Sequence, residues 1–390
     1  MNPNNRKLLL ISQNFPPELT ASTVLVNNIF KYYKGEFTAI AGFVGGRIEP
    51  GFHPPCNTYY LTPPNNYLLK RIYYKIMPRL RFFNKWRMLR LARKENPSAI
   101  FGNYPEPEFF ISSYEVAEKL KVPFYAYFHD LWTENMHRKF ELNQALKWEE
   151  IIVKNSKKVV CCSEFQQQYF KSKYNIDTEL LLHPVPDDEV INLSFKKIPK
   201  RIEKKICFVG SLSNAMNTDA LITLSKAVKL LPPEYKIYWY PIQEISKDFL
   251  RSIGFETDRI NIRVLPTFEM KKAVSESDIL FAPLSFKNCS EHEVKTVFSN
   301  KILTYLTAGR PILVYSPPDS YHSISAAREG WGYVVDIDDA KLLADSIINL
   351  SSDEKLQKKI VAGAIKEAEK RKASYQADKI KEWIIEETKS

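Results

Sequence analysis

The sequence predicts an α/β protein made of two similar halves. Short apolar runs of strand length alternate with longer segments of helical period along its 390 residues, which favours parallel sheets covered by helices. Two prolines and a basic stretch interrupt this alternation after Pro184, and it restarts near Lys205. We expect a first domain over 1–190, a linker over 191–204, a second domain over 205–372, and a C-terminal helix over 373–390 that packs on the first domain.

The first half contains apolar runs that fit buried strands. In order they are Leu8–Ser12, Thr38–Val44, Thr58–Leu61, Ala99–Gly102, Phe124–Phe128, Lys158–Cys162 and Glu179–Leu182. Stretches of helical period separate several of them, at Thr20–Tyr33, Pro107–Leu120 and Leu142–Asn155. Helices that join parallel strands form right-handed crossovers, so one buried parallel sheet is expected here.

The second half repeats this pattern. Its strand candidates are Lys205–Val209, Lys236–Tyr240, Asn261–Leu265, Asp278–Ala282, Pro311–Tyr315 and Gly332–Val335. Its helix candidates are Asp219–Leu231, Phe268–Ser275, Val297–Thr307, Ala340–Asn349, Asp353–Ala373 and, closing the chain, Ser374–Glu386. A second parallel sheet is therefore expected.

Composition excludes several classes of protein. A hydrophobic fraction of 44% with 26% charged residues is ordinary for a folded globular chain. No run of about 18 apolar residues is present to span a bilayer, and the N-terminus lacks the pattern of a signal peptide, so we expect a cytoplasmic protein. The five cysteines are scattered without a CxxC pair, which predicts reduced thiols and no zinc site.

Nearly all the net charge of +11 comes from one segment. Between Pro50 and Lys94 there is no acidic residue but ten Lys and Arg, without which 46 basic residues face 45 acidic ones. Aromatic residues interleave with these charges at helical spacing, a composition typical of a helix on anionic lipid. We predict that Arg79, Arg81, Phe82, Phe83 and Trp86 contact a membrane surface. A solvated helix whose aromatics pack on their own domain remains an alternative, and so does nucleic acid, although no motif for it is recognisable.

The ends of parallel strands are where such sheets bind ligands, and helix N-termini at that edge suit a diphosphate. Neither half carries GxGxxG or GxxxxGK[ST], which argues against NAD enzymes and P-loop ATPases. Near Val297, a polar loop over Cys289–Thr296 leads into the expected helix, whose free amides at Thr296–Ser299 are suited to a departing diphosphate. Lys301 would add charge there. A solvated helix charge is the alternative for this lysine.

Several segments in order resemble the family 4 glycosyltransferases of the GT-B fold. They are Asn14–Glu18, Pro123–Glu134, Val159–Glu164, Phe208–Leu212 and Ser299–Ile312. The last resembles the donor-site signature Ser-x-Lys-x-x-Glu-Tyr-Leu-x-x-Gly-x-Pro. The resemblance implies two Rossmann-like α/β/α domains that face each other across a cleft. It also implies sugar transfer from a nucleotide-diphosphate sugar to a glycan or lipid-linked acceptor, with retention of configuration and without a metal or other cofactor, in cell-surface polysaccharide biosynthesis.

The resemblance also implies site residues. Donor-binding positions are Gly210, Ser211, Val264, Pro266, Thr267, Thr296, Ser299, Lys301, Thr304 and Tyr305, with the base near Val264–Thr267. Acceptor-side positions are Phe15, Pro16, Glu18, Asp130 and Glu134. His129, expected to be exposed at the cleft, would position the transferred sugar, and Glu293 is the second catalytic candidate. A satisfied polar cap is the alternative for His129, and His183 is expected to be structural or part of a hinge.

The sequence departs from the family pattern at informative places. Thr304 replaces the glutamate expected to hold the ribose, and Ser211–Asn217 lacks the Arg and Lys of many relatives. Compensating charge must then come from Lys301, Lys295, Arg310 and the helix amides. Asp336–Asp339 is interpreted as a helix N-cap at Asp338 or Asp339 rather than a metal site.

Two further functions therefore remain open. One is a non-catalytic GT-B-like protein that binds a glycan or a partner. The other is a sugar-nucleotide epimerase, whose acid and base would come from His129, His292, Glu291 and Glu293.

Overall fold

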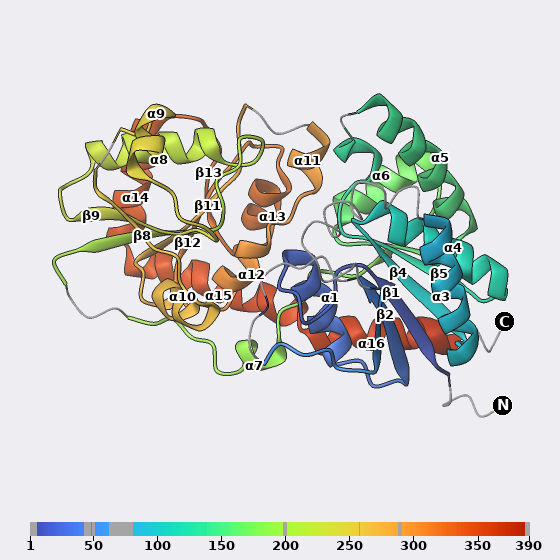
Figure 1. Ribbon diagram of the computed structural model, residues 1–390. Coiled ribbons are helices and arrows are strands. Elements are labelled where there is room, and N and C mark those ends of the chain that lie inside the picture. Colours follow the sequence, from blue (N-terminus) through green and yellow to red (C-terminus); the bar gives the residue numbers. More distant parts are fainter. Residues whose placement is uncertain are drawn as a thin grey trace. The chain divides into compact units, whose positions relative to one another are not determined.

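The computed structural model describes residues 6–42, 48, 51–61, 81–136, 138–197, 201–256, 258–287 and 291–386 (Figure 1). These residues form two compact units. The first unit holds the chain up to Pro184 together with the last helix, α16 (Ala373–Glu386). The second unit runs from Val185 to Lys372.

The first unit is built on one sheet of seven parallel strands in the order β3-β2-β1-β4-β5-β6-β7. The strands are β1 (Leu8–Ser12), β2 (Phe37–Gly42), β3 (Thr58–Leu61), β4 (Ala99–Tyr104), β5 (Phe124–Phe128), β6 (Lys158–Cys161) and β7 (Glu179–Leu180). The helices are α1 (Ala21–Lys31), α3 (Arg81–Glu95), α4 (Pro107–Leu120), η1 (Thr133–Asn135), α5 (Lys139–Asn155) and α6 (Glu164–Tyr174), besides α16.

Strand β5 shows why this sheet is buried on both faces. Phe124, Ala126 and Phe128 point into one core, which α3, α4, α5 and α6 cover. Tyr125 and Tyr127 point into the opposite core, which α1 and α16 cover. An uninterrupted apolar strand is therefore stable only between two helical layers.

The second unit repeats this plan with six parallel strands in the order β10-β9-β8-β11-β12-β13. The strands are β8 (Lys204–Val209), β9 (Tyr235–Tyr240), β10 (Ile260–Ile262), β11 (Ile279–Pro283), β12 (Ile312–Tyr315) and β13 (Tyr333–Val335). The helices are α7 (Asp187–Val190), α8 (Thr218–Leu230), α9 (Lys247–Ser252), α10 (Thr267–Ser275), α11 (Glu291–Thr296), α12 (Asn300–Leu306), α13 (Tyr321–Glu329), α14 (Ala340–Ser352) and α15 (Glu354–Lys370). The predicted fold class, α/β with two parallel sheets, is confirmed.

The first unit ends earlier than the predicted limit of 190. The amide of Val185 donates to the carbonyl oxygen of Arg371 at 2.8 Å, and Val185 pairs with Lys372 in an isolated parallel bridge. This pairing ties the segment after Pro184 to the end of α15, so α7 belongs to the second unit.

The region before α12 differs most from the sequence-based expectation. The segment predicted as a polar loop over Cys289–Thr296 contains α11, and α12 begins at Asn300 rather than Val297. The structure also has a helix, α13, that the sequence did not predict. Arg79 and Cys289 lie outside the described residues, as do the side chains of Arg81, Glu291 and Glu293.

Candidate functional site

In the second unit, the loops after β8 and β9 lie at one edge of the sheet, because parallel strands end together. Gly210 follows β8 with a φ of 120°, a conformation that a residue with a Cβ rarely adopts. Its amide donates to the carbonyl oxygen of Tyr240 at 3.1 Å, and its own carbonyl oxygen accepts from Trp239 Nε1 at 2.7 Å. These bonds fix the turn after β8 against the end of β9.

Lys301, in the first turn of α12, reaches back to this turn. A Cβ built on Gly210 would lie 3.5 Å from Lys301 Cε and 4.0 Å from its Nζ, and Nζ is 4.8 Å from the ring centroid of Phe208. Among the described residues no carboxylate pairs with this ammonium. Burial lowers its pKa to about 8. Lys301 is therefore not the solvated helix charge that the sequence left open, and it is suited to hold an anion.

The start of α12 is held by a histidine that the sequence analysis missed. The amide of Ser299, the N-cap residue, donates to Nε2 of His322 on α13 at 3.1 Å. His322 is 1% exposed, and burial together with the charge of Lys301 lowers its pKa to about 3. The imidazole is therefore neutral near pH 7. No local pattern predicts this contact, because it joins residues 23 positions apart.

Because α12 begins at Asn300, the amides over Thr296–Ser299 are not the first amides of a helix starting at Val297, as the sequence predicted. Thr296 is the last residue of α11, and its hydroxyl donates to the carbonyl oxygen of His292 at 2.7 Å. The Ser299 amide already has His322 as its acceptor. The amides suited to an anion are therefore those of α12 itself, which begins at Asn300.

Two other donor positions lie on α12. Tyr305 is fully buried, its hydroxyl accepts from the amide of Val209 at 2.9 Å, and burial raises its pKa. Its polar atom thus braces the end of β8 rather than facing a ligand. Thr304 is partly buried, one turn after Lys301, so the two share a face of the helix.

Arg310 is not available to a diphosphate, contrary to expectation. It is 3% exposed, and its guanidinium donates to the backbone carbonyl oxygens of Ser277, Asp278 and Lys196. Burial lowers its pKa to about 10. Lys301 therefore carries more of the proposed charge compensation than the sequence suggested.

A pocket of about 630 Å³ lies between the loops that follow β8 and β9. Its lining residues are Ser211, Leu212, Asn214, Gln243, Glu244, Ile245, Ser246 and Phe249. Ser211 is the one predicted donor residue among them. Val264, Pro266 and Thr267 lie where β10, the strand beside β9, leads into α10, and they do not line this pocket.

In the first unit, His129 follows β5 and is 5% exposed, so the expectation of an exposed histidine is wrong. Its ring lies 4.2 Å from that of Tyr127 and 5.8 Å from that of His183, centroid to centroid. Burial, with a smaller effect of His183, holds the pKa of His129 well below its usual value. Within the described residues neither ring nitrogen has a hydrogen-bond partner, so His129 is not a satisfied cap either. Buried nitrogens of this kind are ready to bond a ligand or water.

The acceptor-side positions divide into two groups. Phe15 is a core residue at 1% exposure, and the carbonyl oxygen of Pro16 accepts from Tyr60 Oη at 2.5 Å. Glu18 is buried near Glu106, whose pKa is raised by burial and by the Glu18 charge, although a hydrogen bond with Asn14 opposes this. Glu18 thus belongs to a polar group after β1 and β4, whereas Phe15 and Pro16 support the fold.

Residues of α5 and α6 hold the loop after β5 that carries Asp130 and Glu134. Asp130 is partly buried, and Glu134 accepts from Tyr169 Oη at 2.5 Å. Glu149 on α5 is fully buried and accepts four hydrogen bonds, from the Thr133 amide and hydroxyl, from Lys173 Nζ and from Tyr174 Oη, at 2.7–3.2 Å. This network makes the loop rigid.

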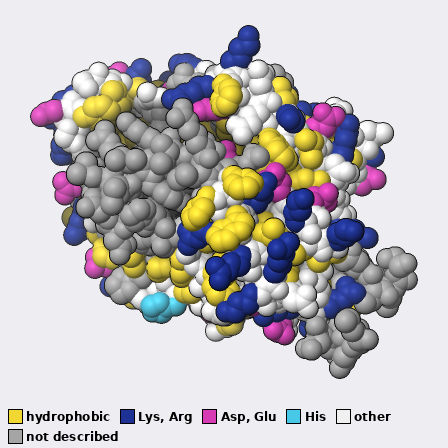
Figure 2. All heavy atoms as spheres, turned by 45° about the vertical axis from the view of Figure 1, so that its right-hand side comes forward, with side chains coloured by type: hydrophobic (Ala, Val, Ile, Leu, Met, Phe, Trp, Pro, Cys, Tyr) yellow, Lys and Arg dark blue, Asp and Glu magenta, His cyan; other side chains and the backbone are white. Residues whose placement is uncertain are grey.

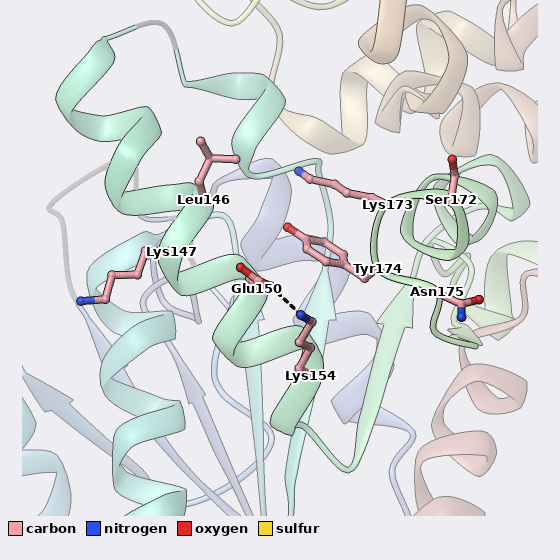
Figure 3. A pocket seen from close by; sticks show the side chains of 8 residues that line it. All are labelled: Leu146, Lys147, Glu150, Lys154, Ser172, Lys173, Tyr174 and Asn175. Carbon is pink, nitrogen blue, oxygen red and sulfur yellow. Dashed lines mark hydrogen bonds and ion pairs between the residues drawn. The ribbon is translucent and has the colours of Figure 1, made fainter.

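A pocket of about 480 Å³ lies beside this network, between α5 and α6 (Figure 3). Its lining residues are Leu146, Lys147, Glu150, Lys154, Ser172, Lys173, Tyr174 and Asn175. Glu150 and Lys154 form an ion pair at 2.5 Å across one helical turn. None of the predicted site residues lines this pocket.

Helix α3 exposes aromatic side chains among basic ones. Phe82, Phe83 and Trp86 are 76%, 51% and 52% exposed. Figure 2, which brings the α3 side of Figure 1 forward, shows hydrophobic side chains interleaved with Lys and Arg. Lys85 Nζ and Arg87 Cζ lie 5.7 and 5.9 Å from the ring centroids of Phe82 and Phe83. About half or more of each of these three side chains is therefore not covered by its own domain.

In the described part of the chain, no group of three or more His, Cys, Asp or Glu side chains is arranged to hold a metal ion. Asp339 is the N-cap of α14, accepting from the Leu342 amide at 2.7 Å, as predicted. Cys161, Cys162 and Cys207 are buried free thiols. No described helix combines the length and apolarity needed to cross a bilayer.

Comparison with known proteins bears on both units. Residues 52–185 match the model of the family described as Glycosyltransferase Family 4, about a third of the chain. No curated protein sequence matches the chain. Its structure is similar to that of Anabaena HepE in complex with UDP-glucose (TM-score 0.67, 13% identity, 97% of this chain and 98% of that one).

Two other solved structures extend this likeness. The sucrose-phosphate synthase of Thermosynechococcus elongatus gives a TM-score of 0.69 at 13% identity, over 97% of this chain and 98% of that one. The lipopolysaccharide outer core galactosyltransferase WaaB, in its apo form, gives 0.63 at 10%, over 98% and 99%. The predicted resemblance to family 4 and the GT-B fold are both confirmed.

Proposed function

We propose that this protein is an enzyme that transfers a sugar from a nucleotide-diphosphate sugar to a glycan or lipid-linked acceptor. Its GT-B glycosyltransferase fold and the match of residues 52–185 to Glycosyltransferase Family 4 support this. The observation that carries this is Lys301, a cation without a carboxylate partner among the described residues, beside the turn at Gly210. The complex of HepE with UDP-glucose makes a uridine diphosphate sugar the first donor to test.

In the proposed reaction the bond between the anomeric carbon of the sugar and the diphosphate breaks, and a bond forms from that carbon to a hydroxyl oxygen of the acceptor. The hydroxyl proton passes to solvent, and the diphosphate leaves with additional negative charge. Lys301 and the first amides of α12 stabilise that charge, and stabilisation that grows toward the transition state accelerates the step. His129 positions the transferred sugar through a neutral ring nitrogen and does not attack it. Retention of configuration, independence of a metal and a role in surface polysaccharide assembly are parts of this proposal that rest on the family resemblance.

The direct test is calorimetric binding of UDP, GDP, ADP and CDP, followed by nucleotide release from the corresponding sugars. We expect saturable binding of one diphosphate, weakened in Lys301→Met. The exposed Lys341 on α14 supplies the matched control, because Lys341→Met removes the same charge far along the chain from α12. Absence of binding by every nucleotide would exclude the enzyme.

A glycan- or partner-binding protein without catalytic activity is the second candidate. Thr304 in place of a carboxylate, and the buried Arg310, both reduce the groups available to a donor. A hydroxyl does not provide the charge-assisted, bidentate acceptance of a carboxylate. Binding without turnover, whatever acceptor is supplied, would favour this candidate.

We further propose that α3 docks on anionic membrane, so that the enzyme acts as a peripheral protein on the cytoplasmic face and meets a lipid-linked acceptor there. Exposed aromatics beside basic residues support this. The wild type should sediment with phosphatidylglycerol vesicles at low salt, and the triple change Phe82→Ser, Phe83→Ser and Trp86→Ser should abolish this. Phe140→Ser with Phe268→Ser, which removes two rings that are 80% and 81% exposed elsewhere, is the control. Equal sedimentation of wild type and triple variant would contradict the proposal.

A further inference from the structure

We propose that His322 is a positioning residue of the donor site: its neutral imidazole accepts the Ser299 amide and thereby holds α12, with Lys301, in the geometry that receives a diphosphate. The inference rests on the proposed donor site but concerns a residue outside the family motifs identified in the sequence. Its starting point is the hydrogen bond of 3.1 Å between the Ser299 amide and Nε2 of His322.

The direction of this hydrogen bond fixes the chemistry of the ring. Because Nε2 accepts, the proton of the neutral imidazole is on Nδ1, which has no hydrogen-bond partner within the described residues. A protonated imidazole would lose the bond to Ser299. Burial and the nearby ammonium of Lys301 both hold the pKa of His322 low, so the ring stays an acceptor throughout the physiological range.

The surroundings of His322 leave it little freedom. Phe298 packs edge-on against the His322 ring at 6.2 Å between centroids and against Trp331 at 6.0 Å. The guanidinium of Arg371 lies 3.8 Å from the centroid of Phe298. Lys301 is the charged group that acts on His322 from α12. The residues that precede α12 are thus held by α13 and by the end of α15.

The hydrogen bond between Ser299 and His322 determines how firmly Lys301 is held in place. Helix α12 is only seven residues long and has no side-chain cap at its N-terminus, so its own hydrogen bonds hold its start weakly. Ser299 supplies the amide that His322 binds, two residues before Lys301. Loss of the acceptor should let the first turn of α12 shift, and a small displacement of a positioned charge weakens its interaction with an anion.

The test compares two replacements of His322. His322→Gln keeps an acceptor near the position of Nε2, whereas His322→Leu keeps the bulk and removes the acceptor. We expect His322→Leu to weaken UDP binding about tenfold and His322→Gln to stay within about twofold of the wild type. His53→Leu, at an exposed histidine of the first unit, should leave UDP binding unchanged.

Ser299, whose amide donates this hydrogen bond, offers a second test if His322→Leu does not fold. Ser299→Pro removes the amide hydrogen, and the φ of −65° at Ser299 is the value that proline requires. UDP binding should weaken as in His322→Leu. Where His322→Leu does fold, adding it to Ser299→Pro should cause no further loss, because both changes remove the same interaction.

A readout without nucleotide separates this inference from the proposed function. Competitive acetylation followed by mass spectrometry gives the pH midpoint of Lys301 reactivity, which we expect near 8 in the wild type and in His322→Gln. In His322→Leu it should rise toward the ordinary value as Lys301 moves into water. If no nucleotide binds but this midpoint shifts, the proposed function fails and the positioning role stands. An unchanged midpoint in His322→Leu overturns the positioning role, as does UDP binding equal to that of the wild type.

Discussion

Two lysines in the two units differ in what surrounds their charge. Lys173 of the first unit pairs with the fully buried Glu149 at 2.8 Å and also contacts the Thr133 hydroxyl. Lys301 of the second unit lies over the ring of Phe208 with no carboxylate partner in the described part of the chain. A paired charge inside a protein stabilises a particular loop geometry. A buried charge without a counter-ion instead destabilises the folded state until an anion binds. We therefore expect Lys173 to stabilise the fold and Lys301 to bind an anion.

The largest expected effect comes from breaking the pair. Lys173→Met would leave Glu149 buried without its counter-ion, and we expect a loss of about 3 kcal/mol in the free energy of unfolding. Urea unfolding at pH 7 measures this loss, and UDP affinity of the folded variant should remain that of the wild type. Lys147→Met, which removes a charge from the same pocket that is not in the Glu149 network, is the control. A loss below about 1 kcal/mol would show that the pair contributes no more than a surface salt bridge.

Replacing Lys301 should have the next largest effect, and it should stabilise the fold where replacing Lys173 destabilises it. Lys301→Met should weaken UDP binding at least tenfold, because a hydrogen bond to a charged group contributes about 1.5–3 kcal/mol. The same change should raise the free energy of unfolding at pH 7 by about 1–2 kcal/mol, since an ammonium with a lowered pKa is removed from an apolar site. Calorimetry and urea unfolding measure the two quantities on one preparation. A variant that loses both stability and binding would indicate a structural role for Lys301.

These two sites also show how far the sequence alone could be interpreted. An uninterrupted apolar run is enough to predict a strand such as β5, and a helical period is enough to predict α4. Lys301 was predicted from a motif whose members lie within one helix and its flanks. Local patterns are sufficient where the interacting groups are close in sequence.

The parts that were missed depend on contacts between distant residues. Glu149 meets Lys173 across 24 positions, and His322 meets Ser299 across 23. Arg310 and Lys301 lie near each other in sequence. Nothing local shows that backbone carbonyls of other elements bind Arg310, while Lys301 has no such partner among the residues that the structure describes. The burial of His129 beside His183 likewise follows from the folded sheet rather than from β5. Charge and residue type are read from a sequence, but the environment that decides their role is set by tertiary packing.

The smallest effect is a pH dependence that should distinguish Lys301 from an ordinary surface lysine. Its pKa is about 8 in the folded protein against an ordinary value of 10.5, so between these values the unfolded chain binds more protons. The free energy of unfolding of the wild type should therefore rise with pH across that window relative to that of Lys301→Met. The excess free energy of unfolding that the variant has at pH 7 should shrink by about 1–2 kcal/mol. Over the same range UDP affinity of the wild type should fall, with its midpoint displaced above 8 because the bound diphosphate favours the ammonium. Lys341→Met should follow the wild type in both measurements, and parallel curves for wild type and Lys301→Met would mean that the ammonium is solvated like any other.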